Sequence, residues 1–85
     1  MSSSAVDPVR DAAALLARGD WRAAHEIVQA NESLPHAAWA HGIVHILEGD
    51  LDNARYWYGR AGRRFPSPPS AEDELHALRA ALDAG

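Results

Sequence analysis

Two histidines and a glutamate share one side of a predicted helix. His41, His45 and Glu48 follow one another at spacings of four and three residues, and at about 100° per residue they fall within an arc of about 60°. Histidines four residues apart on a helix can bind one metal ion, and a carboxylate one turn further on can supply a third ligand. The pattern differs from the H-E-x-x-H signature because Gly42 stands where that motif has its general base.

Two polar side chains on the next predicted helix extend this candidate into a pocket for a small molecule. They are Asn53 and Tyr56, so the candidate ligand-binding set is His41, His45, Glu48, Asn53 and Tyr56, and the candidate metal ligands are His41, His45 and Glu48. His25, on the second predicted helix, adds a ligand only if the two hairpins pack so that it lies next to these histidines. Paired histidines with a carboxylate can also perform acid–base chemistry. We nevertheless name no catalytic residue, expect no cofactor, and favour a protein that is not an enzyme, because no nucleophile motif or glycine-rich phosphate loop is present.

The alternative interpretation, which we favour at this point, is that the histidines are structural. Alignment of two similar turns in the chain puts His45 at the place of Leu15, a position that faces a partner helix. A histidine buried there near Tyr58 would be neutral, because burial disfavours the charged form. Its hydrogen-bond partner would be Glu48, Tyr58 or a backbone carbonyl.

The helices that hold these side chains are predicted by a motif that occurs twice, Gly19-Asp20 and Gly49-Asp50. Glycine ends a helix in the left-handed conformation, and aspartate caps the helix that follows. We therefore expect two antiparallel helical hairpins over about 7–31 and 35–65, with helices at about 7–18, 21–31, 35–48 and 51–64. The proline-rich residues 66–69 end the fourth helix, and Ser70 begins a C-terminal helix over about 70–83. No stretch alternates with period two, so the fold class is all-α without strands.

Length and composition limit the protein to one small domain. The 85 residues contain no cysteine, which excludes disulfides and thiolate metal sites. We expect a flexible leader over residues 1–6 and a single helical domain over 7–85. The N-terminal residues lack the pattern of a signal peptide, and no apolar stretch approaches the roughly 20 residues of a membrane span. These features predict a cytoplasmic protein that does not bind membranes.

Charge argues against nucleic acid as a partner. The net charge is −4, whereas binding to a phosphate backbone relies on positive charge. Four arginines do gather in one short segment: Arg55, Arg60, Arg63 and Arg64. A solvated helix end accounts for such a cluster better than an anion or RNA site, and arginine there complements the helix dipole.

The second hairpin resembles the tetratricopeptide repeat. The positions that carry the resemblance are Gly42, Ala54, Tyr58, Ala61 and Pro66, and in the first hairpin Ala12, Leu15, Gly19 and Ala24. Asn31 departs from the pattern, and the two turn glycines lie 30 residues apart, against about 34 in the family. The run W-x-H-x3-H-x2-E-G-D-x2-N-A-x-Y-W-Y is also similar to that of a group of small uncharacterised proteins. The first resemblance implies a fold of stacked hairpins, and neither implies a catalytic residue.

A second, aliphatic face of the third helix predicts an interface. Trp39, Ile43 and Ile46 lie nearly opposite the histidines. Either both faces are covered, which makes this helix central, or the aliphatic face binds a protein partner or a second copy. Because two hairpins alone often need a cap or a second copy, we expect a small, non-enzymatic interaction module, a homodimer through this face being one form. The competing hypothesis is the ligand or metal site.

Overall fold

The computed structural model describes residues 7–84 as an all-α fold. Within this range there is no strand, as the sequence predicts, and the leader expected over residues 1–6 lies outside it. The five helices are α1 (Pro8–Ala17), α2 (Trp21–Ala30), α3 (Ala37–Glu48), α4 (Leu51–Arg60) and α5 (Ala71–Ala84).

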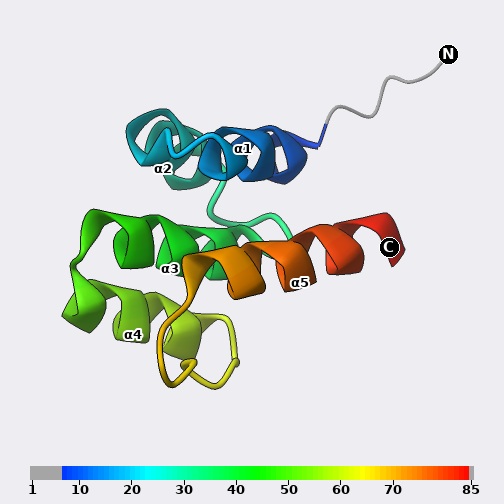
Figure 1. The fold of residues 1–85 in the computed structure, drawn as a ribbon. Coiled ribbons are helices and arrows are strands. Elements are labelled where there is room, and N and C mark those ends of the chain that lie inside the picture. The colour runs from blue at the N-terminus through cyan, green and yellow to red at the C-terminus, as the bar shows by residue number, and fades with distance from the viewer. Residues whose placement is uncertain (1–6, 85) are drawn as a thin grey trace, which may run out of the picture.

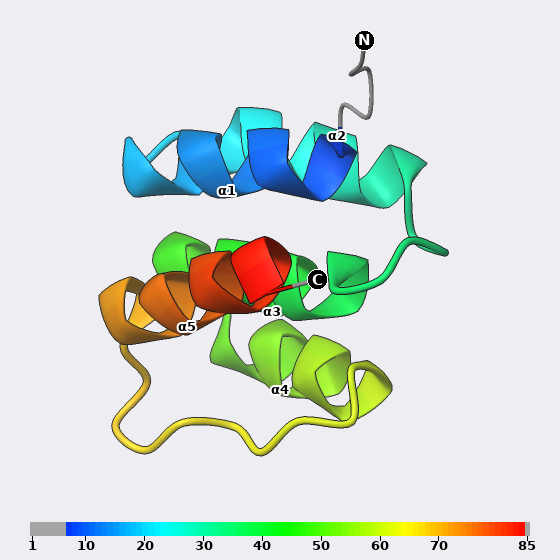
Figure 2. The same cartoon turned by 90° about the vertical axis from the view of Figure 1, so that its right-hand side faces the viewer.

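The helices form three layers with α3 at the centre (Figure 1). α1 and α2 lie side by side on one side of α3, and α4 lies on the other (Figure 2). A long connection leads from α4 to α5, and α5 packs beside α3 in the middle layer. α3 is therefore the one described helix that contacts all four others.

The two Gly-Asp motifs form the sharp corners that the sequence predicts. Gly19 has a φ of 80° and Gly49 a φ of 91°, values that a residue with a Cβ adopts only at a cost. The amide after each glycine, of Asp20 and of Asp50, donates to the carbonyl five residues back at 2.9 Å. Each aspartate side chain then accepts from an amide in the first turn of the next helix. The corners are thus closed by local hydrogen bonds alone.

Two predicted helix boundaries are wrong. The third helix was expected to begin at Pro35, but it begins at Ala37 because His36 has a left-handed φ of 68°. The fourth was expected to continue to about residue 64, but it ends at Arg60. Gly62 closes it with the same geometry as the two corners, since its φ is 70° and the next amide donates to the carbonyl five residues back at 3.0 Å.

The aliphatic face of α3 is covered within the chain, so our expectation of an exposed interface is wrong. Trp39 is 2% exposed and Ile43 is fully buried, while Ile46 is half-buried against the core. Glu74 of α5 accepts a hydrogen bond from Trp39 Nε1 at 3.1 Å and one from the Tyr58 hydroxyl at 2.7 Å. α5 is thus hydrogen-bonded to both α3 and α4. Both faces of α3 are covered within the chain, which is the first of the two alternatives that the sequence allows.

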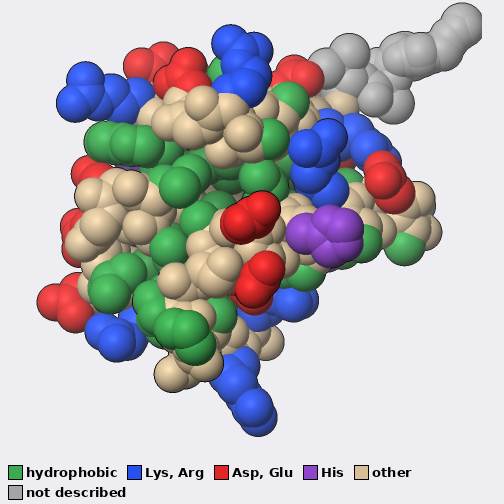
Figure 3. Space-filling view, in the orientation of Figure 1, with side chains coloured by type: hydrophobic (Ala, Val, Ile, Leu, Met, Phe, Trp, Pro, Cys, Tyr) green, Lys and Arg blue, Asp and Glu red, His purple; other side chains and the backbone are tan. Residues whose placement is uncertain are grey.

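The surface mixes both signs of charge. On the face shown in Figure 3, acidic and basic side chains are interspersed, and only two large hydrophobic residues among those described are exposed, Leu47 and Tyr56. None of the described helices has the length and apolar character needed to cross a membrane.

Gly42 allows α3 and α4 to approach closely. A Cβ added at Gly42 would lie 2.5 Å from Tyr58 Cδ1, and the Tyr58 ring cannot move aside easily because it is 1% exposed and bonded to Glu74. Overpacking of this kind costs about 1–3 kcal/mol. We therefore expect Gly42→Ala to lower the free energy of unfolding by about 1–3 kcal/mol in urea titrations. The matched control is Gly59→Ala, whose Cβ meets nothing within 4 Å and which should stabilise the chain by up to about 1 kcal/mol; equal effects of the two substitutions would contradict the close contact.

Candidate functional site

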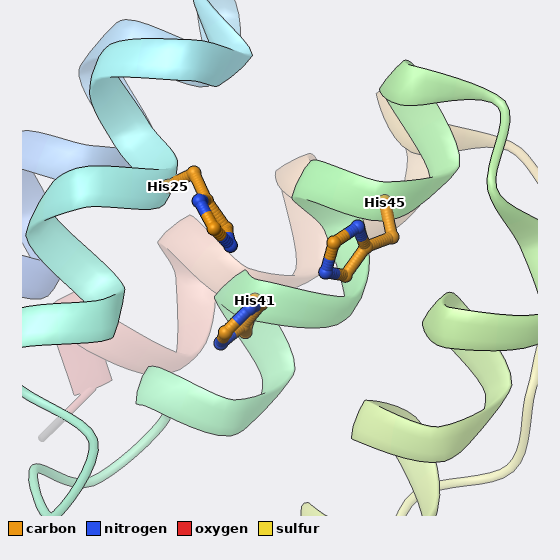
Figure 4. A group of neighbouring side chains, drawn as sticks. All are labelled: His25, His41 and His45. Carbon is orange, nitrogen blue, oxygen red and sulfur yellow. The ribbon is translucent and has the colours of Figure 1, made fainter.

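Three histidine side chains meet between α2 and α3 (Figure 4). They are His25 on α2 and His41 and His45 on α3. One ring nitrogen of each can be chosen so that all three lie within 4.8 Å of one another. The first helix pair thus packs with His25 toward the second pair, so His25 joins His41 and His45 as a possible metal ligand.

The three histidine side chains are buried to different extents because α3 is the central helix. His41 is 4% exposed and His45 is 7% exposed, because α2 and α4 both pack against their side of the helix. His25 is half-buried and forms the outer member of the cluster. The site is accordingly almost closed on the α3 side and accessible from the α2 side.

The indole of Trp57 on α4 completes the packing around His41. The two rings stack with their centroids 3.8 Å apart and an interplanar angle of 11°. His25 meets His41 edge-on at 4.8 Å and His45 at 5.4 Å. His41 therefore contacts the Trp57 indole and the imidazoles of both His25 and His45, which restricts how its ring can turn.

Glu48 orients His45. The carboxylate Oε1 lies 2.7 Å from His45 Nδ1, so Nδ1 is engaged and Nε2 is the nitrogen left for another partner. Metal-bound histidines typically have this arrangement, in which the second ring nitrogen donates to a carboxylate and fixes the tautomer. Of the three partners proposed for a structural His45, Glu48 is the one observed, and the Tyr58 hydroxyl donates to Glu74 instead.

His41 is buried with one nitrogen unsatisfied. Its Nδ1 has no hydrogen-bond partner among the described residues, and an unsatisfied buried polar atom costs about 1–3 kcal/mol. Burial, and then the neighbouring His45 and His25, lower the pKa of His41 from 6.5 to about 4. The ring is consequently neutral at physiological pH and keeps an unshared electron pair for a ligand.

The hydrogen bonds of Asn53 and Tyr56 are made within α4 and its cap, and not with the histidines. Asn53 is exposed in the first turn of α4, where its Nδ2 donates to the side chain of the N-cap residue Asp50 at 3.1 Å. Tyr56 is 55% exposed and accepts from Arg60 at 3.1 Å. Glu48 shares a possible ligand set with His45 and Asp50, and not with His41. The structure therefore does not form the polar pocket expected from these residues, nor the ligand set of His41, His45 and Glu48.

Sequence reasoning assigned no role at this site to Trp57 and only a conditional one to His25. Nothing in the local sequence around Trp57 indicates that it stacks on a histidine. His25 does carry a signal, since it lies on the side of α2 next to the apolar stripe that includes Ala24 and Val28. That signal predicts partial burial, but it does not predict which helix lies opposite.

Comparisons with protein-family models, curated proteins and solved structures return no match for this chain.

Proposed function

We propose that this chain binds one divalent transition-metal ion through His25, His41 and His45. The observation that carries the proposal is the convergence of three imidazoles from two helix pairs, with ligand atoms within 4.8 Å of one another. Three protein ligands that leave a fourth position open are a common arrangement at zinc, and imidazole also suits copper and nickel. On this proposal the chain is a small helical metal-binding protein. Cytoplasmic location and association with a protein partner or a second copy remain predictions from the sequence.

The three ring nitrogens need to move only a short distance toward one another to coordinate one ion. Zinc–nitrogen bonds of about 2.0–2.1 Å at tetrahedral angles separate the ligand nitrogens by about 3.3 Å, which is less than the 4.8 Å limit of the cluster. His25 is half-buried and has the most freedom to turn toward the other two rings. His41 and His45, held by Trp57 and Glu48, would form the rigid side of the site.

The protonation state of His41 favours metal binding at neutral pH. A histidine must be neutral to bind a metal, and binding to a protonated ring releases a proton at a cost in affinity. His41 has a pKa of about 4, so it binds without losing a proton. Coordination through Nδ1 would also remove the cost of leaving that buried atom without a partner.

The proposal is tested by isothermal titration calorimetry with Zn²⁺ at neutral pH, and by the visible spectrum of the Co²⁺ complex. We expect one ion per chain and the absorption bands of a four-coordinate Co²⁺ site. His25→Ala should abolish both signals without unfolding the chain, because His25 is half-buried. Glu48→Gln should weaken binding by about 10–100-fold, the range for an outer-shell partner of a metal ligand.

The matched control is His76→Ala, which removes an exposed histidine on α5. It should leave the stoichiometry and the affinity unchanged. Absence of saturable binding in the wild type would overturn the proposal, and so would a loss of affinity in His76→Ala as large as that in His25→Ala. In either case the three imidazoles would be packing residues only.

A further inference from the structure

A second site, separate from the metal ligands, is formed at the other end of the α3–α4 pair. A cavity of about 360 Å³ lies between the start of α3, the end of α4 and the segment that leads into α3. Its size is within the range of small-molecule sites. Its lining includes two arginines, Arg60 and Arg63, and the indoles of Trp39 and Trp57. The positive charge and the aromatic rings of these side chains indicate which class of ligand the cavity can bind.

The two arginines are held in place by aromatic rings and not by carboxylates. The guanidinium carbon of Arg63 lies 3.4 Å from the centroid of the Trp39 ring, and that of Arg60 lies 5.3 Å from Trp57. Neither arginine forms an ion pair with a carboxylate within residues 7–84. A guanidinium that stacks by its face keeps the N–H donors along its edge available. Arg60 uses one donor for the Tyr56 hydroxyl and has others to offer.

The charge of the cavity favours an anion although the whole chain is acidic. Two arginines outweigh Glu32, the one carboxylate in the lining. Ala38 and Trp39 in the first turn of α3 also line the cavity, and the cap residue of that helix makes no side-chain hydrogen bond to it. The partial positive charge of this helix end therefore adds to that of the arginines.

We propose that this cavity binds the oxyanion group of a small molecule, a phosphate or a carboxylate, through Arg60 and Arg63. Carboxylates and phosphates both accept paired hydrogen bonds from the guanidinium fork. Glu32 repels the anion from its side of the cavity and so restricts where the group can lie. Trp57 lines this cavity and also stacks on His41, so its indole is a spectroscopic probe next to both sites.

The test is an NMR titration of the isotope-labelled chain in the presence of a chelator, with ionic strength held constant by NaCl. One series uses inorganic phosphate and the other uses benzoate, so that the two sources of the oxyanion are distinguished. We expect saturable shifts of the indole N–H of Trp57, assigned with Trp57→Phe, in at least one series. Arg60→Gln combined with Arg63→Gln should weaken binding by about tenfold or more, and Glu32→Gln should strengthen it.

The matched control is Arg22→Gln, since Arg22 is also exposed and lies over an indole, 5.3 Å from the Trp21 ring, but is outside the cavity. It should leave the affinity unchanged. Shifts that do not saturate, that NaCl alone reproduces, or that persist in the double arginine variant would overturn the anion site. Because a chelator is present, this result is independent of whether the histidines bind a metal.

Discussion

Zinc is expected to raise the free energy of unfolding of this chain by about 2.7 kcal/mol when the free ion is at 100 times its Kd, and by about 4.1 kcal/mol at 1,000 times. The reason is that the ligand set exists only in the folded chain. His25 belongs to the first helix pair, whereas His41 and His45 belong to the second. An ion bound by all three joins the two pairs across the α2–α3 contact. Thermal unfolding followed by circular dichroism, with and without zinc, measures the effect.

The size of the shift should be easy to detect. For a domain of 60–100 residues, each kcal/mol moves the midpoint by about 4–8 °C, so a rise of about 10–30 °C is expected over this range of zinc concentration. A chelator should reverse the rise. His25→Ala should unfold at nearly the same temperature as the metal-free wild type and should not respond to zinc. A zinc response that persists in His25→Ala would show that the ion binds elsewhere.

Features of the fold that depend on neighbouring residues were predictable from the sequence. The corner at Gly49 and Asp50 is closed by bonds that span five residues or fewer, so glycine and aspartate at adjacent positions are sufficient to predict it. Ser70 likewise accepts from the amide of Asp73 at 3.2 Å, as its position after the prolines predicts. Gly62 has the same left-handed geometry and is likewise a local stop signal, which a fourth helix over about 51–64 leaves out of account.

Features that depend on distant residues were not predictable in the same way. Trp39 was expected at an exposed interface, yet it is bonded to Glu74, 35 residues away. No pattern around Trp39 indicates that α5 returns to cover it, because hydrophobic periodicity identifies an apolar face without identifying its partner. An unpaired apolar face on a predicted helix thus indicates an interface inside the chain as readily as one between chains.

The candidate site combines both kinds of feature. The spacing of His41 and His45 on one side of a helix is local, and it was predicted. Glu48 was one of the three hydrogen-bond partners considered for His45, and it is the one observed. The third histidine and the stacked indole come from α2 and α4, and their approach is a result of tertiary packing. The sequence therefore offered two of the three proposed ligands, His41 and His45, as candidates beside a favoured structural interpretation, and the third only on condition that α2 packs against α3.

Acidification is expected to destabilise the metal-free chain through His41. The pKa of this histidine is lowered from 6.5 to about 4, mainly by burial and further by His45 and His25. Below pH 6.5 the unfolded chain takes up a proton that the folded chain does not, so the stability that is complete above pH 6.5 is lost as the pH falls toward 4. At about 1.36 kcal/mol for each pH unit, the loss between pH 6.5 and 5 approaches about 2 kcal/mol.

Urea titrations in the presence of a chelator, at intervals between pH 7 and about 5, measure this loss above the range where carboxylates titrate. The charged or titratable groups around the His41 ring are His25 on α2 and His45 on α3, with Glu48 bonded to His45; Trp57 of α4 adds no charge. His41→Gln should make the free energy of unfolding fall less steeply as the pH is lowered through this range, whatever its effect on absolute stability, because the buried imidazole that excludes a proton is gone. His76→Ala should keep the wild-type slope. An unchanged slope in His41→Gln would mean that His41 is not the neutral, buried imidazole on which the metal site depends.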